Sequence, residues 1–367
     1  MQSEHRNRIL KAQSEMQRRG VSRMFIGPGS NLFYLTGIRA MMSERIYLLQ
    51  LPAIGKASLL LPTFERLGAE DSGIDAEIIE WSDATGPDAA TKAFIADASS
   101  GTVGVDDQLW SAFLLDLQTL APKASWTKAS MIMQELRSRK SEAEIKLMKE
   151  AAAIADKTFA ELTQQKFTGK KESQIAAEIQ RLLLMHGQEQ MQFGIVGSGP
   201  NGAKPHHEAS DRVIQPGDSI VLDFGGTYKG YQSDMTRMVV VKDGSLDPEY
   251  ERVHDIVNQA NAAAHAAVKI GAACEDVDRA ARKVISDAGY GDYFTHRTGH
   301  GIGIDVHEHP YIRQGNREVL DEGMAFSIEP GVYLPGRFGV RIEDIAICRE
   351  NGSENINLTP HSVTIVQ

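Results

Sequence analysis

Residues 221–237 read VLDFGGTYKGYQSDMTR, and they place two acidic residues in a segment that otherwise favours β-structure. Asp223 follows large aliphatic residues, and Asp234 comes eleven positions later. The intervening GGTYKG predicts two strands joined by a glycine-containing turn. Such a hairpin brings both carboxylates to one end of a strand pair. Taken alone, this spacing is only a weak indication of a site.

Two further acidic residues stand in apolar segments downstream. Glu329 lies in FSIEPG (326–331), and Glu343 lies in VRIED (340–344). A single carboxylate in a strand core is most often a salt bridge or a turn cap, because burial is costly without a partner. Four that converge are different, since two carboxylates 4 Å apart repel by about 4 kcal/mol at an effective dielectric constant near 20. Converging carboxylates therefore need cations.

The histidines are clustered in the same half of the chain. His296, His300, His307 and His309 fall within fourteen positions, although the whole chain has only 11 histidines. A single histidine is usually structural, but this clustering favours a functional site. Glycines on both sides of His300 permit a close approach of the backbone to that site.

The charge balance of these residues indicates two divalent cations. Asp223, Asp234, Glu329 and Glu343 carry four negative charges, and a neutral His300 adds none. Oxygen-rich ligation favours Mn²⁺ or a similar first-row ion over a structural zinc site, although Co²⁺, Zn²⁺ and Fe²⁺ tolerate such ligands. Two such ions about 3.5–4 Å apart share a water molecule and lower its pKa towards 7.

The pattern of expected strands and helices changes along the chain. Residues 1–125 alternate strand-like and helical segments, which predicts an α/β layer. Expected strands cover 23–26, 46–51, 58–61, 76–79 and 102–105. One expected helix opens the chain and ends near residue 20, and another covers 107–120. The pattern breaks at APKASWTK (121–128), so we expect two domains, residues 1–127 and 128–367.

The second domain is expected to mix helices with glycine-rich strands. SEAE at Ser141 predicts a capping box, in which Ser141 and Glu144 satisfy each other's free N–H groups. Expected helices cover 141–165, 171–186, 248–269 and 275–288.

Composition excludes several classes of protein. The 367 residues include 39 Lys+Arg and 49 Asp+Glu, a net charge of −10, which disfavours nonspecific binding to nucleic acid or to anionic membranes. Two cysteines cannot build a disulfide framework. The N-terminal stretch has no apolar core typical of a secretory signal, and no segment has the ~18 apolar residues of a membrane span. We therefore expect a cytoplasmic protein.

In this order, the segments VLDFGG (221–226), YQSDMTR (231–237), HRTGHGIG (296–303), FSIEPG and VRIED resemble the metal-binding signatures of the M24 or "pita-bread" metallopeptidases. The resemblance covers residues 140–367. Residues 1–125 are similar to the creatinase/prolidase N-terminal domain, with GPGSNLFYLTG (27–37) as the closest match. The resemblance implies an α/β creatinase/prolidase-like N-terminal domain followed by an α+β pita-bread catalytic domain.

The resemblance also implies roles for individual residues. The metal ligands would be Asp223, Asp234, His300, Glu329 and Glu343, of which Asp234 and Glu343 bridge the two ions. Glu329 matches a ligand that often acts as general base as well. No ligand position is altered. A metal-bridging hydroxide is then expected to attack the scissile carbonyl.

Residues around the ligands match the family too. PHHEAS (205–210) supplies His206 and VHEHP supplies His307, as candidates to bind the leaving group or substrate carbonyl and to stabilise the oxyanion. His296 and Arg341 match positions that flank the site. Arg341 is expected either to orient carboxylates or to form a structural salt bridge. His207 and His309 are expected to face solvent.

The N-terminal domain favours the Xaa-Pro branch of this family over the methionine aminopeptidases. The complete ligand set argues against creatinase-like relatives and leaves a non-catalytic binding module as a remote alternative. A dipeptidase must read a free carboxylate next to proline, and Arg39 and Arg45 are candidates for that role, with solvated loop arginines as the alternative. The compact length favours an Xaa-Pro dipeptidase (prolidase) acting on small proline-containing peptides. An Xaa-Pro aminopeptidase acting on longer peptides is the alternative, and the resemblance implies a homodimer.

Overall fold

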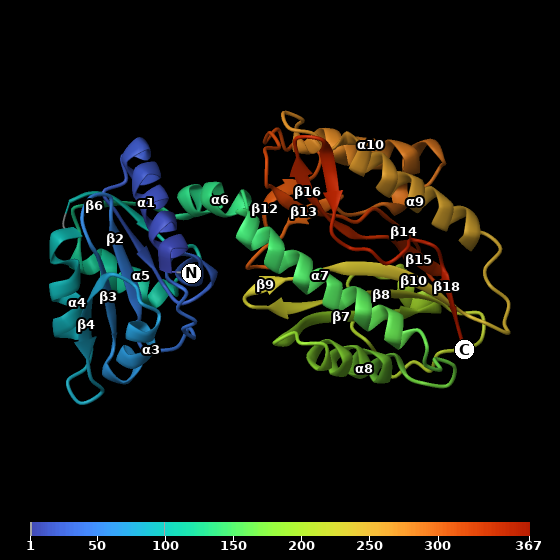
Figure 1. The fold of residues 1–367 in the computed structure, drawn as a ribbon, viewed down its shortest axis with the longest axis horizontal. Coiled ribbons are helices and arrows are strands. Elements are labelled where there is room, and N and C mark those ends of the chain that lie inside the picture. The colour runs from blue at the N-terminus through green and yellow to red at the C-terminus, as the bar shows by residue number, and fades with distance from the viewer. Residues whose placement is uncertain (1, 99) are drawn as a thin grey trace. The chain divides into compact units, whose positions relative to one another are not determined.

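The computed structural model describes residues 2–98 and 100–367. The chain divides into two compact units, Met1–Arg137 and Ser138–Gln367, and each is described by itself (Figure 1). The division falls later than the boundary expected at 127/128. Helix α6 (Ser130–Ser138) follows the segment that suggested a break, and it is bonded to the N-terminal unit. Tyr34 donates to the carbonyl of Leu136 over 3.2 Å, and Arg137 donates to Asn31 over 2.9 Å.

The N-terminal unit is built on a six-stranded sheet with the order β4-β3-β2-β1-β5-β6. The pairs β1/β5, β5/β6 and β3/β4 are parallel, whereas β2 runs antiparallel to both of its neighbours. The strands are β1 (Arg23–Ile26), β2 (Leu48–Pro52), β3 (Ala57–Pro62), β4 (Ala76–Trp81), β5 (Gly101–Val105) and β6 (Ala124–Lys128). The first five were predicted. The sixth was missed because its ASWTK sequence follows turn-forming residues and is only half-buried.

Helices cover both faces of this sheet. Phe94 and Ile95 of α4 and Leu117 of α5 pack with Phe25 and Val103 on one face, and α1 lies beside α2 and β2. The helices are α1 (Gln2–Arg19), α2 (Ser30–Thr36), α3 (Arg66–Asp71), α4 (Asp88–Ile95) and α5 (Ser111–Leu120), with 3₁₀ turns η1 (Thr63–Glu65) and η2 (Ala96–Ala98). The expected α/β layer is therefore present.

The C-terminal unit contains two larger sheets and one two-stranded sheet. Their orders are β18-β10-β8-β7, with β9 paired to β8, then β12-β11-β13-β16-β17, and β14-β15. The strands are β7 (Gln190–Ser198), β8 (Ser219–Tyr228), β9 (Tyr231–Gln232), β10 (Met235–Val241), β11 (Gly299–Gly301), β12 (Glu308–Ile312), β13 (Ala325–Ile328), β14 (Gly331–Leu334), β15 (Phe338–Arg341), β16 (Asp344–Arg349), β17 (Gly352–Asn355) and β18 (Thr364–Val366). The helices are α7 (Glu142–Leu162), α8 (Glu172–Met185), α9 (Tyr250–Ala267) and α10 (Cys274–Asp287), with 3₁₀ turns η3 (Gly199–Ala203) and η4 (Gly291–Tyr293).

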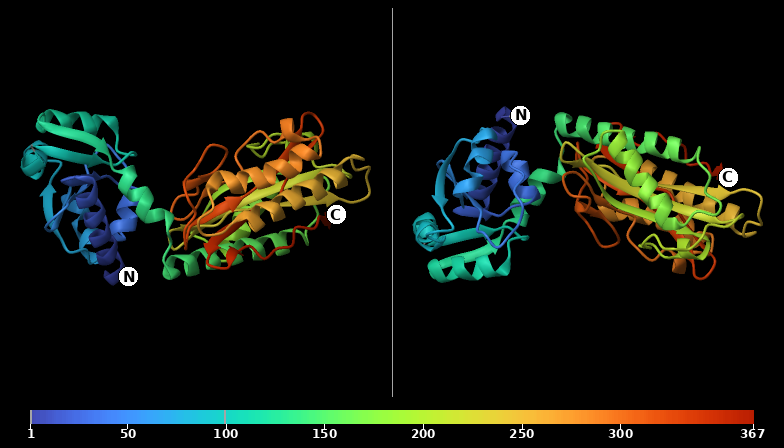
Figure 2. Two further views of the ribbon diagram at one scale, coloured as in Figure 1. Left: turned by 90° about the horizontal axis from the view of Figure 1, so that it is seen from above. Right: turned by 90° about the horizontal axis from the view of Figure 1, so that it is seen from below.

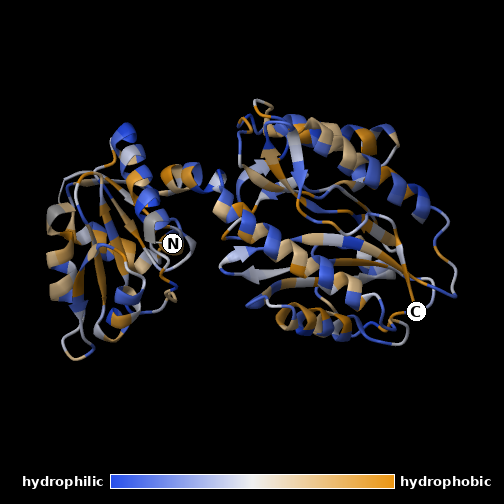
Figure 3. Ribbon diagram, viewed as in Figure 1, coloured by the Kyte–Doolittle hydropathy of each residue, from blue (hydrophilic) through white to orange (hydrophobic). Residues whose placement is uncertain are grey.

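The four long helices of this unit form two layers around its sheets. Figure 2 shows α9 and α10 over the strands in the view from above, and α7 and α8 in the view from below. Hydrophilic and hydrophobic residues alternate along α7 and α9 in Figure 3, as expected for helices with one buried side. All four helices were predicted, and the capping box of Ser141 and Glu144 is formed.

Alternation along β8 sets the direction of its aspartate. Leu222 and Phe224 pack in the core beneath α7 and α8, whereas Val221 packs in the core beneath α9 and α10. Because successive side chains of a strand point to opposite faces, Asp223 shares the face of Val221. The first aspartate therefore points towards the second half of this unit.

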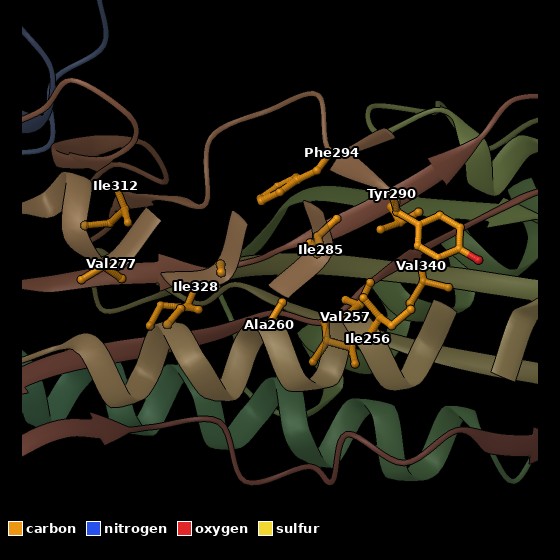
Figure 4. Close-up of a cluster of buried hydrophobic side chains, with 14 of the residues drawn as sticks. Ile256, Val257, Ala260, Val277, Ile285, Tyr290, Phe294, Ile312, Ile328 and Val340 are labelled. Atoms are coloured by element: carbon orange, nitrogen blue, oxygen red, sulfur yellow. The ribbon is translucent and has the colours of Figure 1, made fainter. Parts of the chain in front are cut away.

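The core beneath α9 and α10 supports the remaining acids. Figure 4 shows Val257 and Ala260 of α9 among the side chains that line this core, with Ile328 and Val340 contributed by the strands. Ile328 immediately precedes Glu329. Burial of the apolar neighbour therefore fixes where Glu329 leaves its strand.

Among the residues described, no helix combines the length and the apolarity that crossing a membrane requires. Cys274 and Cys348 are both buried free thiols.

Candidate metal centre and active site

The predicted hairpin is present and carries both aspartates. Strand β8 pairs antiparallel with β9 and β10, and Asp223 lies opposite Thr236. Lys229 and Gly230, with φ angles of 49° and 86°, form the turn that joins β8 to β9. Two successive positive φ angles are typical of the tight turn that matches the twist of a hairpin. Asp234 leads into β10 and is 3% exposed.

The second half of the unit supplies a histidine and two glutamates. His300 lies in β11, Glu329 follows β13, and Glu343 stands between β15 and β16. His300 Nε2 lies 3.3 Å from Glu329 Oε1 and 3.7 Å from Asp234 Oδ2. His300 Nδ1 lies 3.1 Å from the carbonyl of Gly301, which fixes the proton on Nδ1 and turns the lone pair of Nε2 towards the carboxylates.

Glu343 joins the two halves. Its Oε2 accepts from the hydroxyl of Thr236 over 2.7 Å, and its N–H donates to the carbonyl of Thr236 over 3.3 Å. Asp234, His300 and Glu343 each offer a ligand atom, and these atoms lie within 4.8 Å of one another. The expected residues thus converge from both halves of the C-terminal unit.

The carboxylates are buried close to one another. Burial, followed by the charges of Asp223 and Glu329, raises the pKa of Asp234, and burial with the charge of Asp234 raises the pKa of Glu343. Burial raises the pKa of Glu329 to about 7, against the opposing charge of Arg341. These shifts express the cost of gathering negative charge away from water.

Two carboxylate oxygens at this point have no hydrogen-bond donor. Asp223 Oδ1 and Asp234 Oδ1 are buried without a partner among the residues described. Burial of His300, together with the charge of His307, lowers the pKa of the imidazole well below its usual value, so it is neutral and can donate its lone pair. Orphaned carboxylate oxygens beside a neutral imidazole fit hard or borderline divalent cations.

Arg341 is the charged group behind these carboxylates. It donates to Asp223 Oδ2 over 2.5 Å, to the hydroxyl of Tyr333 over 2.7 Å, to Thr236 over 3.1 Å and to the carbonyl of Pro205 over 3.3 Å. This ion pair with Asp223 is compatible with both expected roles of Arg341, as a group that orients carboxylates and as a structural salt bridge.

His296 joins the same network through Tyr333. Its Nε2 lies 2.8 Å from the Tyr333 hydroxyl, and its Nδ1 lies 2.6 Å from the carbonyl of Arg297. Burial, followed by the charge of Arg341, lowers the pKa of His296 to about 4. The sequence did not single out Tyr333, because a tyrosine in a strand is usually part of the core.

The site opens into a cavity of about 950 Å³. His206 and His307 line it together with the expected ligands, and the His307 ring lies 4.1 Å from that of His300. Its wall consists of Gln192, Phe193, Gly194, Ile195, Pro205, His206, His207, Glu208, Asp223, Asp234, His296, Arg297, His300, Val306, His307, Glu329, Arg341 and Glu343.

Comparison with known proteins gives this arrangement a family. The model of metallopeptidase family M24 matches residues 146–350, and that of the creatinase/prolidase N-terminal domain matches residues 8–139. The chain belongs to metallopeptidase family M24. As an M24 enzyme it is a metal-dependent peptidase, and the expected pair of domain folds is confirmed.

Several M24 relatives are similar over almost the whole chain. Probable dipeptidase PepE of Mycobacterium tuberculosis is 40% identical over 95% of this chain and 92% of its own length. The Xaa-Pro dipeptidase of Pyrococcus horikoshii is 33% identical over 96% and 97%. The crystal structure of a recombinant prolidase from Thermococcus sibiricus superposes with a TM-score of 0.94 at 38% identity and covers 99% of both chains.

The M24 site has a support that the sequence did not reveal. Asp278 and Arg282, one turn apart on α10, hold the backbone that carries His296, and we call this pair the α10 clamp. Arg282 donates to the carbonyls of Phe294 over 3.0 Å and His296 over 2.8 Å. Asp278 accepts from the N–H of Thr298 over 3.2 Å and from its hydroxyl over 2.8 Å. Only the i, i+4 spacing of an acid and an arginine could have indicated the pair.

His207 is not solvent-facing, contrary to expectation. Its side chain is 9% exposed, and its Nε2 lies 2.7 Å from Glu172 Oε2. Glu172, at the start of α8, also accepts hydrogen bonds from Ser198, Ser210 and Asn201. Burial alone would raise the pKa of Glu172, but these donors lower it to about 2. The loop that carries His206 is therefore fastened to α8.

The other expected residues lie elsewhere. His309 is partly exposed and packs against Tyr311, with ring centroids 4.6 Å apart. Arg39 and Arg45 belong to the N-terminal unit. Arg39 lies over the Phe33 ring at 5.1 Å, whereas Arg45 makes two hydrogen bonds of 3.1 Å with Asp83.

Proposed function

We propose that this M24 enzyme is an Xaa-Pro dipeptidase. The observation that carries the proposal is the convergence of three buried carboxylates, the half-buried Glu329 and a neutral histidine in the wall of a cavity lined by further histidines. Relatives of nearly equal length are named as dipeptidases of this kind, including the one from Pyrococcus horikoshii. Small proline-containing peptides are therefore the proposed substrates.

We infer that Asp223, Asp234, His300, Glu329 and Glu343 would hold two divalent ions, with Asp234 and Glu343 in the shared role that the family resemblance implies. Mn²⁺ is the favoured ion because most of these ligands are oxygens. When bound, such ions polarise the scissile carbonyl and activate water. The orphaned oxygens of Asp223 and Asp234 support this assignment.

Side chains around the ions would transfer the proton and bind the substrate. Glu329 Oε1 accepts from Ser327 over 3.1 Å, which leaves Oε2 to take a proton from the attacking water and pass it to the leaving nitrogen. His307 and His206 line the cavity, where an N–H can donate to the developing oxyanion and to the carbonyl before the scissile bond. His296 is held by Tyr333 and the α10 clamp, ready to contact the substrate.

The first test is hydrolysis of Ala-Pro and Ala-Pro-Ala in parallel, with Mn²⁺ and with EDTA. Manganese-dependent cleavage of the dipeptide alone is expected. Efficient cleavage of the tripeptide would instead identify an Xaa-Pro aminopeptidase. Cleavage of neither peptide by metal-loaded protein would contradict the proline assignment and favour another M24 substrate or a binding module.

Arg39 and Arg45 remain candidates to close the site from the partner subunit of a homodimer. We expect Arg39→Ala and Arg45→Ala to raise KM for Ala-Pro while leaving kcat within a few-fold, since neither touches the reacting atoms. Arg18→Ala, which removes an exposed arginine paired with Glu15 on α1, is the matched control. Sedimentation tests the dimer, and unchanged KM in both variants would remove these arginines from the site. The buried free thiols agree with a cytoplasmic location.

A further inference from the structure

Two arginines line the cavity, and they differ in whether an acidic side chain pairs with their charge. Arg341 is buried and bonded to Asp223, Tyr333, Thr236 and a backbone carbonyl. Arg297 is half-buried, and its guanidinium forms no ion pair with an acidic side chain in the part of the chain that the structure describes. An arginine facing a substrate cavity without an acidic partner is available to an anionic ligand.

The position of Arg297 is nevertheless well defined. Its guanidinium lies over the ring of Tyr311, 4.6 Å from the centroid, which holds the cation by its face and leaves its N–H edge open. The backbone on both sides is fixed, because Arg282 of the α10 clamp binds the carbonyl of His296 and Asp278 binds the N–H of Thr298. Little conformational freedom would be lost when a ligand binds.

Arg297 also acts on the part of the cavity where the chemistry is proposed to occur. Arg297 and His307 both line the cavity, and the His307 ring lies 4.1 Å from the ring of the expected ligand His300. A group bound by Arg297 would lie beside the reacting peptide bond.

We propose that Arg297 binds a carboxylate of the substrate and so determines which peptides the enzyme accepts. This inference rests on the proposed Xaa-Pro dipeptidase function, because such a substrate offers a carboxylate in two places. One is the free C-terminus on proline, and the other is an acidic side chain before proline. Both match the planar fork of a guanidinium.

Arg297 fits this role better than Arg45 of the N-terminal unit, whose side chain already has acidic partners. Arg45 already binds both carboxylate oxygens of Asp83 and also pairs with Glu44. A substrate carboxylate would have to displace those partners. Arg297 has no such competitor among the residues described, so binding costs it less desolvation and rearrangement.

The test compares Arg297→Gln and Arg297→Lys with the wild type, and Arg313→Gln serves as the matched control. Arg313 is an exposed arginine that donates to the carbonyl of Gln314, so its substitution removes the same charge outside the cavity. Metal content and circular dichroism of each variant show whether the metal site and the fold are intact. The substrates are Ala-Pro, Asn-Pro and Asp-Pro, and the competitive inhibitors are proline and prolinamide.

If Arg297 binds the C-terminal carboxylate, Arg297→Gln raises KM for all three dipeptides by roughly 10- to 100-fold, the range for loss of a charge-assisted hydrogen bond. The kcat values of this variant stay within about threefold of the wild type. Its preference for proline over prolinamide as an inhibitor disappears, and Arg297→Lys restores part of that preference. If Arg297 binds an acidic side chain, only the ratio of Asp-Pro to Asn-Pro falls. Either result supports the proposal and identifies the source of the carboxylate.

Equal losses for proline and prolinamide together with an unchanged ratio of Asp-Pro to Asn-Pro would overturn the role of Arg297, as would full activity of Arg297→Gln. A wild type that cleaves no Xaa-Pro dipeptide would contradict the proposed function instead. Calorimetric affinities for proline and prolinamide then still decide the role of Arg297. Loss of a preference for the carboxylate in Arg297→Gln would support it, and retention of that preference would refute it.

Discussion

Two buried carboxylates in this molecule have pKa values that are shifted in opposite directions. Glu172 is surrounded by donors, and its pKa falls to about 2. Glu343 is 1% exposed among other acids, and its pKa rises. Glu172 is stable as an anion within the protein, whereas Glu343 needs a nearby cation to be stable as an anion. Electrostatic surroundings thus separate a structural acid from a proposed metal ligand even where sequence context does not.

Glu343→Gln tests the metal role directly. The amide keeps the shape of the side chain but loses the charge, so we expect metal content to fall and kcat/KM to drop on the order of 100-fold or more. Elemental analysis of dialysed protein measures the first effect, and Ala-Pro hydrolysis measures the second. Glu354→Gln, which alters an acid paired with Lys149 and Arg349, should leave both unchanged. Full metal occupancy in Glu343→Gln would remove Glu343 from the ligand set.

Glu172→Gln tests the structural anion. Because the folded-state pKa lies below the ordinary value of 4.5, Glu172 contributes stability that is fully present above about pH 4.5 and is lost as the pH falls towards 2. We expect the variant to be less stable than the wild type by roughly 2–3 kcal/mol at pH 7, with the difference shrinking at pH 3. Urea denaturation at both values measures it. The exposed Glu251→Gln is the control, and a difference that stays constant with pH would contradict the assignment.

At the scale of elements, helix α10 does more than cover a sheet. The α10 clamp fixes the loop that carries His296, and the carbonyl of Thr298 in that loop accepts the N–H of Glu329 over 2.8 Å. A helix on the outside of the unit is therefore bonded, through one loop, to an expected metal ligand.

Asp278→Ala is expected to loosen that connection. Removing the acceptor frees the N–H and hydroxyl of Thr298, so hydrogen exchange in residues 294–298 should accelerate and kcat/KM should fall about tenfold. Lys283→Ala, on the same helix and paired with Asp287 on the exposed side, is the matched control. Unchanged exchange in this loop would show that the clamp does not position it.

The sequence predicted elements with strong local signals and missed those that depend on tertiary contacts. Strand Arg23–Ile26 and the hairpin at Asp223 follow from apolar runs and turn residues. Helix α5 begins at Ser111 instead of near 107, since Asp106 to Trp110 form a turn that ends in an extended residue. Helix α2 and strand β6 carry weak periodicity, and their neighbours stabilise them.

The candidate site divides in the same way. The motifs and the family resemblance supplied the residues expected to bind metal, whose roles remain proposals. Tyr333, Glu172 and the α10 clamp were not found, because each acts through partners in other segments of the chain and its residue type is unremarkable in its own segment. Such partners become visible only in three dimensions.

At the scale of the whole molecule, the carboxylates of the proposed metal site are expected to make the stability of metal-free protein depend on pH. Burial gives Glu329 a folded-state pKa of about 7, above its ordinary 4.5. A raised pKa contributes stability that is present below about pH 4.5 and is lost as the pH rises through 7. Repulsion among the buried acids should therefore grow with pH in chelated protein.

Glu329→Gln isolates this effect. In EDTA the variant should gain stability relative to the wild type as the pH rises from 5 to 8, by roughly 1–3 kcal/mol. Urea denaturation across this range measures the difference, and the comparison cancels the contributions of the histidines. A relative stability that is flat or falls with pH would show that Glu329 is not destabilised by its neighbours.

The division of the site between two halves has a consequence for how the protein is made. Asp223 and Asp234 belong to the half that the ribosome delivers first, whereas His300 and Glu343 belong to the half that follows. A nascent chain therefore carries only part of the proposed ligand set until Glu343 has been added. With the ligands as proposed, selection between ions by coordination geometry can begin only after that point, so it belongs to the maturation of the protein.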